Sequence, residues 1–287
     1  MRSTDGVLLV DKPAGLTSHD VVAAARRALG ERRIGHAGTL DPFATGLLVL
    51  LVGRATRLLP YVEGEPKVYD ATIRFGAETD TDDVTGTPTR QAAPPLLADL
   101  ESSIDKLTGV IAQLPPAYSA KKVGGVRSYA AARRGDAPEL APVPVAVHEW
   151  RVHARRDMDL DVTVVCGGGT YVRALARDLG RLAGSAAHLA ALRRVSSGPF
   201  HVRDAHSLER IRGDVPPPPL RSPLDAIPSL PVERLDAAAV ERVARGQTVD
   251  ATAPGDRVAM VDVDGSLVAL GERAGTRWQP RVVLSNG

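Results

Sequence analysis

An aspartate stands in a segment that is rich in residues which shape the backbone. The segment is RIGHAGTLDPFATG, residues 33–46, and its acid is Asp41. Its three glycines permit positive φ or close approach of another backbone, and Pro42 pushes Asp41 into an extended conformation. Asp-Pro pairs are also common in ordinary turns. Because the loop runs directly into an apolar strand, we expect it to hold the Asp41 carboxylate as a positioned acid.

A second segment, CGGGTYVRALARDLG over residues 166–180, places three glycines before a predicted helix. Backbone N–H groups at such a helix start can bind phosphate. The P-loop pattern is absent, however, and GGGTYV lacks the last glycine of G-x-G-x-x-G, which disfavours a nucleotide site. We instead expect a tight turn that presents Arg173 from the first helical turn. A guanidinium near a carboxylate favours its ionised form, as a nucleophilic or electrostatic acid requires.

Other candidate sites do not match known patterns. TDTDD, residues 79–83, departs from the calcium-loop pattern because Val84 and Thr85 stand where Asn or Asp and Gly are required. We interpret this segment as an acidic turn. The seven histidines follow no recognised ligand spacing, and Ser119, like the pair Ser196 and Ser197, lacks a G-x-S-x-G context. The sequence therefore favours neither a catalytic metal nor a serine hydrolase.

Basic residues gather in YSAKKVGGVRSYAAARRG, residues 118–135, which contains no acid. The five charged side chains belong to Lys121, Lys122, Arg127, Arg133 and Arg134. Tyr118 and Tyr129 lie between them, and cations interleaved with aromatic rings suit an RNA backbone with exposed bases. The segment LRRVSSGPFHVR adds Arg193, Arg194 and Arg203. The alternative is an ordinary solvated surface.

Composition limits the remaining possibilities. With 287 residues, of which 44% are hydrophobic, the chain can bury a sizeable core. A formal net charge of +2 means that any attraction to a polyanion must come from local clusters. Cys166 is the single cysteine, which excludes an intramolecular disulfide and fits a reducing compartment. The sequence has neither a signal peptide nor a membrane-spanning apolar run, so we expect a cytoplasmic protein.

The elements that must position these residues alternate between strands and helices. Residues 7–10 predict a strand, followed by a helix that Thr17 or Ser18 caps and Gly30 ends. After the Asp41 loop, LLVLLVG has the length and apolarity of a buried strand. The pattern further predicts helices at 55–62, 96–109 and 170–184 and strands at 68–76, 149–156 and 159–166.

The proline-rich segment 213–231 predicts a stiff connector and a domain boundary. Beyond it, DAAAVERVARG predicts one helix and the later segments predict short strands, with a hairpin at Asp264 and Gly265. We therefore expect a large first domain and a module of about 60 residues.

Residues 33–58, RIGHAGTLDPFATGLLVLLVGRATRL, closely resemble the signature of the TruB family of tRNA pseudouridine-55 synthases, which includes the catalytic subunits of RNA-guided pseudouridine synthases. Further segments resemble successive family blocks in the expected order, from residue 7 to about 205. They are LLVDKPAGLTSHDVV, KVYDATIRFGAETDTDDVTG, QLPPAYSAKKVGGVRSYAAARRG and GGGTYVRALARDLGRLAG, the last followed by HLAALRRVSSGPF. Five ordered blocks are far more specific than one Asp-Pro pair.

The resemblance implies an α+β fold, in which a mixed-sheet pseudouridine synthase domain carries an inserted basic lid and is followed by a small PUA-like β-barrel. It implies a catalytic domain over residues 1–222, with the RNA-binding lid at about 119–148. A PUA-like RNA-binding domain over residues 228–287 is expected from order and size alone.

The resemblance also implies residue roles. Asp41 matches the essential catalytic aspartate, and Arg173 matches the arginine that pairs with it. Tyr69 matches the tyrosine that stacks on the target uracil and takes part in the final proton removal; the alternative is a strand tyrosine packed in the core. Leu192 lies in the block that lines the uracil pocket. His36 matches a histidine that replaces flipped bases, since a stacked uridine must leave the loop before its sugar can be reached.

These assignments predict isomerisation of uridine 55 in the tRNA T loop, with the lid bound to the T arm, by a monomer that uses no cofactor or metal. Asp41 acts either as a nucleophile at the sugar or in removing a sugar proton to give a glycal, and the sequence leaves both routes open. One alternative function is a non-catalytic RNA-binding or RNA-chaperone protein on the same fold. Another is an N-glycosidase, which would release free uracil.

Overall fold

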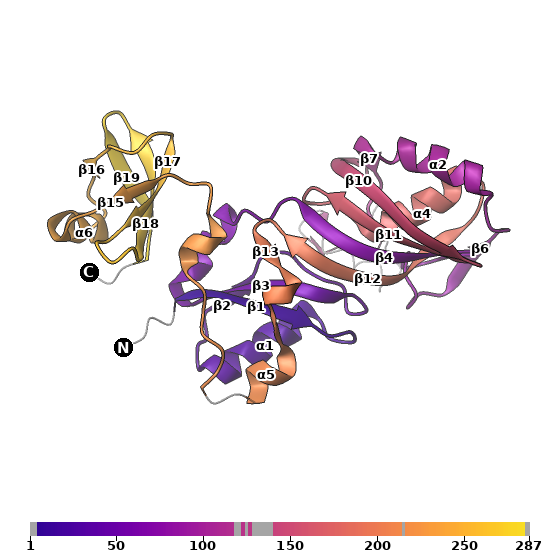
Figure 1. Ribbon diagram of the computed structural model, residues 1–287, viewed down its shortest axis with the longest axis horizontal. Coiled ribbons are helices and arrows are strands. Elements are labelled where there is room, and N and C mark those ends of the chain that lie inside the picture. Colours follow the sequence, from indigo (N-terminus) through magenta and orange to yellow (C-terminus); the bar gives the residue numbers. More distant parts are fainter. Residues whose placement is uncertain (1–4, 118–121, 124–125, 128–139, 214–215, 285–287) are drawn as a thin grey trace. The chain divides into compact units, whose positions relative to one another are not determined.

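The computed structural model describes residues 5–117, 122–123, 126–127, 140–213 and 216–284 (Figure 1). The chain divides into two compact units. Unit 1 consists of Met1–Leu40, Leu47–Gly64 and Pro199–Gly287, and unit 2 consists of Asp41–Gly46 and Glu65–Gly198. Within the described residues, no helix is long and apolar enough to cross a membrane.

The N-terminal part of unit 1 confirms the predicted strand, turn and helix. It comprises β1 (Gly6–Lys12), α1 (Ser18–Leu29), β2 (Ile34–His36), β3 (Thr45–Val52) and the 3₁₀ helix η1 (Gly53–Tyr61). Thr17 caps α1 in a capping box with Asp20, and Gly30 ends the helix in the left-handed region at φ 63°. The predicted helix at 55–62 is therefore a 3₁₀ helix that begins two residues earlier.

The C-terminal part of unit 1 begins with short elements. They are β13 (Phe200–His201), η2 (Val202–Asp204), β14 (His206–Ser207), α5 (Leu208–Gly213) and η3 (Pro223–Ala226). A five-stranded sheet follows in the order β15 (Val232–Arg234), β17 (Arg257–Val261), β18 (Leu267–Ala274), β19 (Arg277–Val283) and β16 (Val249–Asp250). The predicted helix is α6 (Ala237–Ala244), capped by Asp236, and the predicted hairpin joins β17 to β18.

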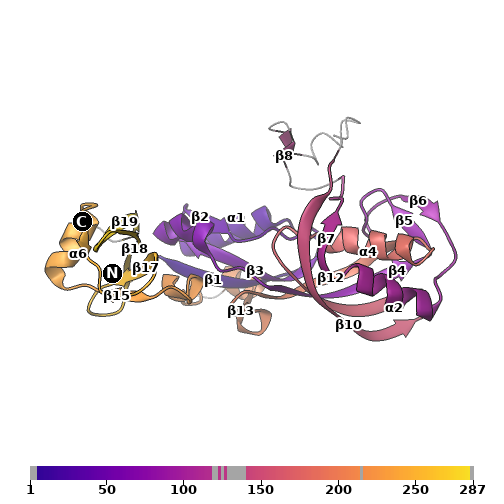
Figure 2. The ribbon, with the colours of Figure 1, turned by 90° about the horizontal axis from the view of Figure 1, so that it is seen from above.

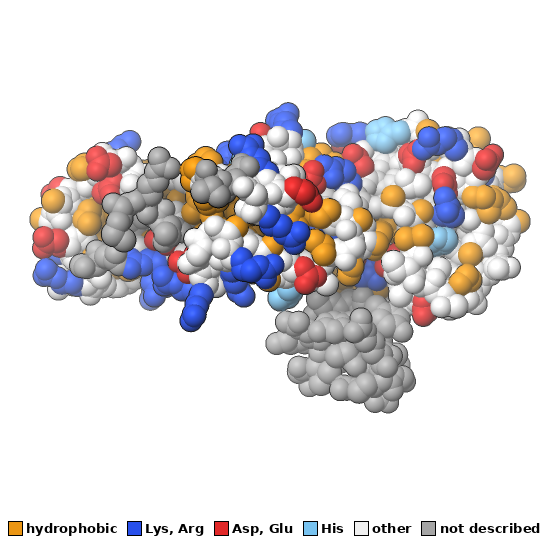
Figure 3. Space-filling view, turned by 90° about the horizontal axis from the view of Figure 1, so that it is seen from below, with side chains coloured by type: hydrophobic (Ala, Val, Ile, Leu, Met, Phe, Trp, Pro, Cys, Tyr) orange, Lys and Arg blue, Asp and Glu red, His pale blue; other side chains and the backbone are white. Residues whose placement is uncertain are grey.

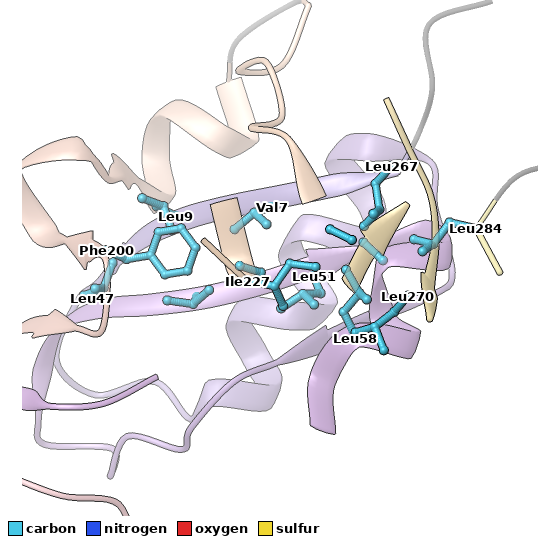
Figure 4. Packing of buried hydrophobic residues seen from close by; sticks show 14 residues of the cluster. Val7, Leu9, Leu47, Leu51, Leu58, Phe200, Ile227, Leu267, Leu270 and Leu284 are labelled. Carbon is cyan, nitrogen blue, oxygen red and sulfur yellow. The ribbon is translucent and has the colours of Figure 1, made fainter. Parts of the chain in front are cut away.

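A single apolar cluster connects the two parts of unit 1 (Figure 4). Val7 and Leu9 of β1 and Leu51 of β3 belong to the same cluster as Leu267 and Leu270 of β18. Ile227 in the proline-rich segment is 2% exposed and belongs to it too. This segment is thus partly buried, whereas the sequence predicts an extended connector.

Unit 2 contains the sheet that positions the candidate site. Its order is β12 (Ala187–Ser197), β4 (Lys67–Phe75), β11 (Asp159–Cys166), β10 (Val143–Arg156) and β7 (Gly109–Gln113), with all four pairings antiparallel. The first residues of β3, Thr45 and Gly46, pair in parallel with β12 and make the sheet mixed. Figure 2 shows the pronounced bend of β10, which carries two register shifts against β11.

The two faces of this sheet differ in character because side chains alternate along a strand. Tyr69, Ala71, Ile73 and Phe75 of β4 are buried and define what we call the inner face. Asp70, Thr72 and Arg74 lie between them on the outer face. Residues opposite one another in antiparallel strands share a face, so the register extends this division to β12 and β11.

The helices of unit 2 are α2 (Leu97–Lys106) and α4 (Val172–Leu182). Helix α4 packs against β12 and β4 and approaches β12 closely at Gly180, where an added Cβ would lie 2.6 Å from the backbone N of Ala187. Two strand pairs complete the unit: β5 (Ala77–Thr79) with β6 (Pro88–Gln91), and β8 (Lys122–Val123) with β9 (Val126–Arg127).

Candidate active site

The Asp41 loop is fixed at both of its ends. Within unit 1, the Ser18 hydroxyl donates to the carbonyl of Leu40 at 3.1 Å and accepts from its N–H at 2.9 Å. Within unit 2, the backbone of Thr45 pairs with β12, and the Thr45 hydroxyl donates to the carbonyl of Leu192 at 3.4 Å. The side chain of Asp41 remains 35% exposed. The loop therefore presents a carboxylate that a ligand can reach.

The structure explains why position 46 of this segment is a glycine. It has φ 99°, and a Cβ at this position would lie 2.3 Å from the carbonyl oxygen of Arg194. Only glycine combines this backbone conformation with so close an approach. Positive φ or close approach is expected here from the sequence, and both occur.

Arg173 forms the predicted ion pair with Asp41. It lies in the first turn of α4, its Nε is 2.9 Å from one carboxylate oxygen, and its second terminal nitrogen donates to the other at 3.2 Å. One charge-assisted hydrogen bond and one close ion-pair contact orient both side chains. Arg173 is only 4% exposed, whereas the side chain of Asp41 is partly exposed. A buried guanidinium therefore supports an accessible carboxylate.

The start of α4 is held by Gln113 at the end of β7. The Gln113 amide accepts from the N–H of Tyr171 at 2.8 Å and donates to its carbonyl at 3.1 Å. Gln113 is completely buried, so this contact fixes the turn from which Arg173 projects.

The predicted acidic turn at residues 79–83 supplies a second carboxylate to Arg173. One oxygen of Asp83 accepts from the hydroxyls of Thr81 and Thr85, and its other oxygen lies 3.5 Å from Arg173. Arg173 also donates to the carbonyl of Thr81 at 2.8 Å. The turn is thus part of the support of the acid.

Two further arginines of α4 pair with this turn and with the residue that precedes it. Arg177 pairs with Asp82 at 2.8 Å and donates to the carbonyl of Leu114, and Arg181 pairs with Glu78 at 2.7 Å. Burial raises the pKa of Asp82, although Arg177 opposes that shift. Spacing by four residues brings successive arginines to one side of the helix.

Tyr69 and Leu192 lie on the inner face of the sheet. Leu192 is opposite Ala71 in the pairing of β12 with β4, two residues from Tyr69. Tyr69 is 7% exposed, and burial raises the pKa of its phenol; the nearby charge of Asp41 raises it further, while Arg194 lowers it. Tyr69, Asp41 and Arg173 therefore belong to one electrostatic neighbourhood.

Cys166, at the end of β11, is buried and close enough to Tyr69 to affect the pKa of its phenol. Burial raises the pKa of its thiol to about 11, so the side chain is neutral at physiological pH. The thiolate, and not the neutral thiol, is the nucleophilic form of cysteine. The Cys166 thiol is therefore not in its nucleophilic form.

The remaining predicted site residues are His36 and the basic segment. His36 is in β2 of unit 1, where its ring meets the edge of His19 with 5.6 Å between ring centroids. Of the basic segment, the structure describes only the backbone of Lys122 and Arg127, in β8 and β9. Lys121, Arg133 and Arg134 lie outside the described residues.

The structure adds residues to the site that were not predicted from the sequence. Asp82 and Asp83 are predicted only as members of a turn, and Arg194 only as part of a basic surface. Arg194 is 1% exposed, so it does not contribute to a solvated basic surface. The regular spacing of arginines in α4 was the available signal for the buried ion pairs.

Figure 3 shows basic and acidic side chains interspersed over one side of the molecule. This pattern agrees with the small net charge of +2. On the outer face of the unit 2 sheet, Arg74 pairs with Asp159 at 2.7 Å and the Thr72 hydroxyl donates to Asp161 at 2.8 Å.

Comparison with known proteins identifies the family. The TruB family pseudouridylate synthase model for the N-terminal domain matches residues 26–172, and the tRNA pseudouridylate synthase B C-terminal domain matches residues 173–215. The tRNA pseudouridine synthase B of Thermobifida fusca (strain YX) is 44% identical, with 98% of this chain and 99% of the relative covered. The tRNA pseudouridine synthase B of Nocardia farcinica (strain IFM 10152) is 45% identical, with 97% of this chain and 93% of the relative covered.

The fold agrees as well. The crystal structure of a Cbf5–Nop10–Gar1 complex matches with a TM-score of 0.73 and 24% identity, covering 99% of this chain and 86% of that chain. This similarity confirms the mixed α+β fold with a mixed sheet. Given also the identity to curated relatives over nearly the whole length, the chain belongs to the TruB family of pseudouridylate synthases.

Proposed function

We propose that this chain, a tRNA pseudouridine synthase by family, converts uridine 55 of the tRNA T loop to pseudouridine. The observation that carries the proposal is the partly exposed carboxylate of Asp41, paired at 2.9 Å with the buried Arg173 in the same unit as Tyr69. An accessible anion on a rigid buried support is what a reaction at a ribose carbon requires.

The reaction breaks the N1–C1′ bond, turns the uracil while it remains bound, joins C5 to C1′ and removes the C5 proton. Asp41 either attacks the sugar as a nucleophile or assists removal of a sugar proton to give a glycal. In both routes the carboxylate must face the sugar, and the two contacts from Arg173 hold it in one orientation.

Tyr69 and Leu192 are proposed to hold the uracil. Both lie on the inner face of the sheet, where the phenol ring offers a stacking surface and Leu192 a branched apolar wall. Tyr69 is further proposed to take part in removal of the C5 proton. The pairing register supports contact of Tyr69 and Leu192 with one base, because it places Leu192 opposite Ala71, next to Tyr69 on the same face.

RNA binding by the rest of the chain is part of the proposal. His36 would occupy the space left by the flipped base, and the basic segment at residues 119–148 would bind the T arm. Residues 228–287 would form a PUA-like domain, and the five-stranded sheet with α6 supports this assignment. The proposed catalytic domain is residues 1–222.

The test uses unmodified T-arm stem-loop RNA, incubated with the protein without added cofactor, followed by mapping of pseudouridine at each position. We expect product at uridine 55. The isosteric variant Asp41→Asn should lose at least about 10³-fold in rate while it retains RNA binding, because it removes the charge but little volume.

Three results would contradict the proposal. Product formation by Asp41→Asn at the wild-type rate would remove the carboxylate from the mechanism. Release of free uracil would identify an N-glycosidase. RNA binding without conversion by the wild-type protein would favour the non-catalytic RNA-binding alternative.

A further inference from the structure

Adjacent arginines in β12 have opposite surroundings. Arg193 faces the outer side of the sheet, opposite Asp70, and is partly exposed. Arg194 lies opposite Tyr69 on the inner face and is 1% exposed. A guanidinium stays charged when buried and needs partners for its donors. The burial of Arg194 therefore indicates a specific role within the sheet.

One partner of Arg194 is the Tyr69 side chain. The two residues are direct neighbours across the antiparallel pair of β12 with β4, and the guanidinium donates a hydrogen bond to the phenol oxygen. Cross-strand neighbours have Cβ atoms roughly 5 Å apart, so a long side chain can reach along its neighbour to the terminal oxygen. This contact holds the far end of the Tyr69 ring.

The backbone of Arg194 is fixed from the other side. It pairs in parallel with Gly46, where the approach leaves no room for a Cβ. Gly46 ends the loop that carries Asp41. One residue thus contacts the Asp41 loop through its backbone and Tyr69 through its side chain.

We propose that Arg194 is a positioning residue for Tyr69, which holds the phenol ring and its oxygen in place for the bound uracil. The proposal rests on the proposed function, since it takes Tyr69 as the residue that contacts the base. In this proposal two buried arginines have similar functions: Arg173 orients the carboxylate of Asp41, and Arg194 orients the phenol of Tyr69.

The electrostatics agree with this role. Burial is the largest influence on Tyr69 and raises its pKa, whereas the charge and hydrogen bond of Arg194 lower it. Arg194 therefore favours negative charge on the phenol oxygen, and Tyr69 carries that charge only after its phenol has lost a proton and can accept another from C5.

The substitution Arg194→Lys separates charge from geometry. Lysine keeps the positive charge but replaces the planar fork with a compact ammonium on a flexible stem. Arg74→Lys is the matched control, because Arg74 lies in the same sheet on the outer face and its side chain is 49% exposed. Thermal unfolding establishes that each variant is folded before it is compared.

The contact is measured without activity in protein labelled with [¹³Cζ]tyrosine. The chain has five tyrosines, and the Tyr69 signal is identified by its loss in Tyr69→Phe. We expect Arg194→Lys to move the Tyr69 signal and Arg74→Lys to leave it in place. In the wild-type protein, a Tyr69 signal that coincides with that of a solvent-exposed tyrosine would overturn the proposal, even if Arg194→Lys does not fold.

The consequence is measured as the single-turnover rate of pseudouridine formation on the T-arm stem-loop. We expect Arg194→Lys to lower this rate by about 10- to 100-fold, with the Kd for RNA changed less than about threefold. Arg74→Lys should stay within about twofold of wild type in both quantities. The double variant Arg194→Lys with Tyr69→Phe should be no slower than Tyr69→Phe alone.

An unmoved Tyr69 signal, or an unchanged rate in folded Arg194→Lys, overturns the proposal. A further tenfold loss in the double variant also overturns it, because Arg194 would then act independently of the Tyr69 hydroxyl. If the wild-type protein forms no pseudouridine, the proposed function fails, while the tyrosine signal still reports whether Arg194 holds Tyr69.

Discussion

Helix α4 and the outer face of the unit 2 sheet contain the same kinds of ion pair in different environments. The side chains of Arg173 and Arg177 are 5% and 7% exposed, and their partners Asp83 and Asp82 are 6% and 10% exposed. On the outer face, Arg74 is 49% exposed in its pair with Asp159. The outer distance of 2.7 Å is as short as those of the buried pairs. Burial therefore separates the two groups, and distance does not.

This difference determines what each pair does. Exposed charges are screened by water, and an exposed pair contributes only about 0.2–1 kcal/mol. Buried charges have lost their hydration, so removal of one partner leaves the other uncompensated at a cost of about 3–5 kcal/mol. Arg173, which holds the partly exposed Asp41, thus belongs with the buried charges that are most sensitive to the loss of a partner. Four predictions test this comparison.

The largest effect is expected for Arg173→Met. The variant removes the support of Asp41 and leaves Asp83 without its nearby cation, so it should lower the rate of pseudouridine formation by about 10²–10³-fold and stability by about 3–5 kcal/mol. Single-turnover kinetics and urea unfolding measure the two quantities. A stable and active variant would show that burial does not make this pair important.

Arg177→Met should separate stability from activity. Arg177 contacts Asp82, Asp178 and the carbonyl of Leu114, none of which is proposed to touch the substrate. We expect a stability loss of about 3–5 kcal/mol in urea unfolding, with less than a tenfold change in rate under conditions where the protein is folded. A rate loss equal to that of Arg173→Met would mean that the ion pairs of α4 act as one catalytic unit.

Much of this arrangement was predictable because local rules and tertiary structure agree. Thr17 caps α1, Gly46 takes the positive φ that its segment suggests, and Arg173 projects from the first turn of α4 to meet Asp41. Turn glycines, helix caps and apolar periodicity act over a few residues, so a sequence reveals them directly. The pairing of Asp41 with Arg173 needed the family resemblance as well, since no local rule relates residues so far apart.

The parts that were missed depend on tertiary structure. No element was predicted at residues 187–197, because AHLAALRRVSS lacks strict alternation, yet pairing with β4 on one side and β3 on the other makes this segment a strand. The burial of Asp82, Asp83 and Arg194 follows from that sheet and from α4 packed against it. Charged residues are normally exposed, so composition alone predicts the wrong environment for these three.

The pH dependence of stability should have opposite signs in the two regions. Arg74 lowers the pKa of Asp159, so this pair stabilises the fold above the unfolded pKa of 3.8 and the contribution is lost as pH falls through the folded value. Burial raises the pKa of Asp82, so its ionisation costs stability as pH rises from 3.8 through the folded value. Urea unfolding between about pH 3 and 7 measures both.

In that experiment, wild type should gain stability relative to Asp159→Asn as pH rises, by about 0.5 kcal/mol, because the exposed Arg74 limits the effect. Relative to Asp82→Asn, wild type should lose stability as pH rises, because Asp82 ionises in a buried site. If wild type gained stability with pH relative to both variants, the pKa of Asp82 would be lowered, because Arg177 would outweigh the effect of burial.

The smallest effect is expected for Arg74→Met, which removes the outer-face counterpart of Arg177. Both arginines make contacts of similar length to an aspartate, and methionine replaces each with an apolar chain of comparable reach. Because water can solvate Asp159 once its partner is gone, we expect a stability loss of at most about 1 kcal/mol and a rate within about twofold of wild type. Urea unfolding of the two variants side by side makes the comparison direct. A loss in Arg74→Met as large as that in Arg177→Met would show that geometry, and not desolvation, sets the strength of these pairs, and the argument that burial supports Asp41 would fail with it.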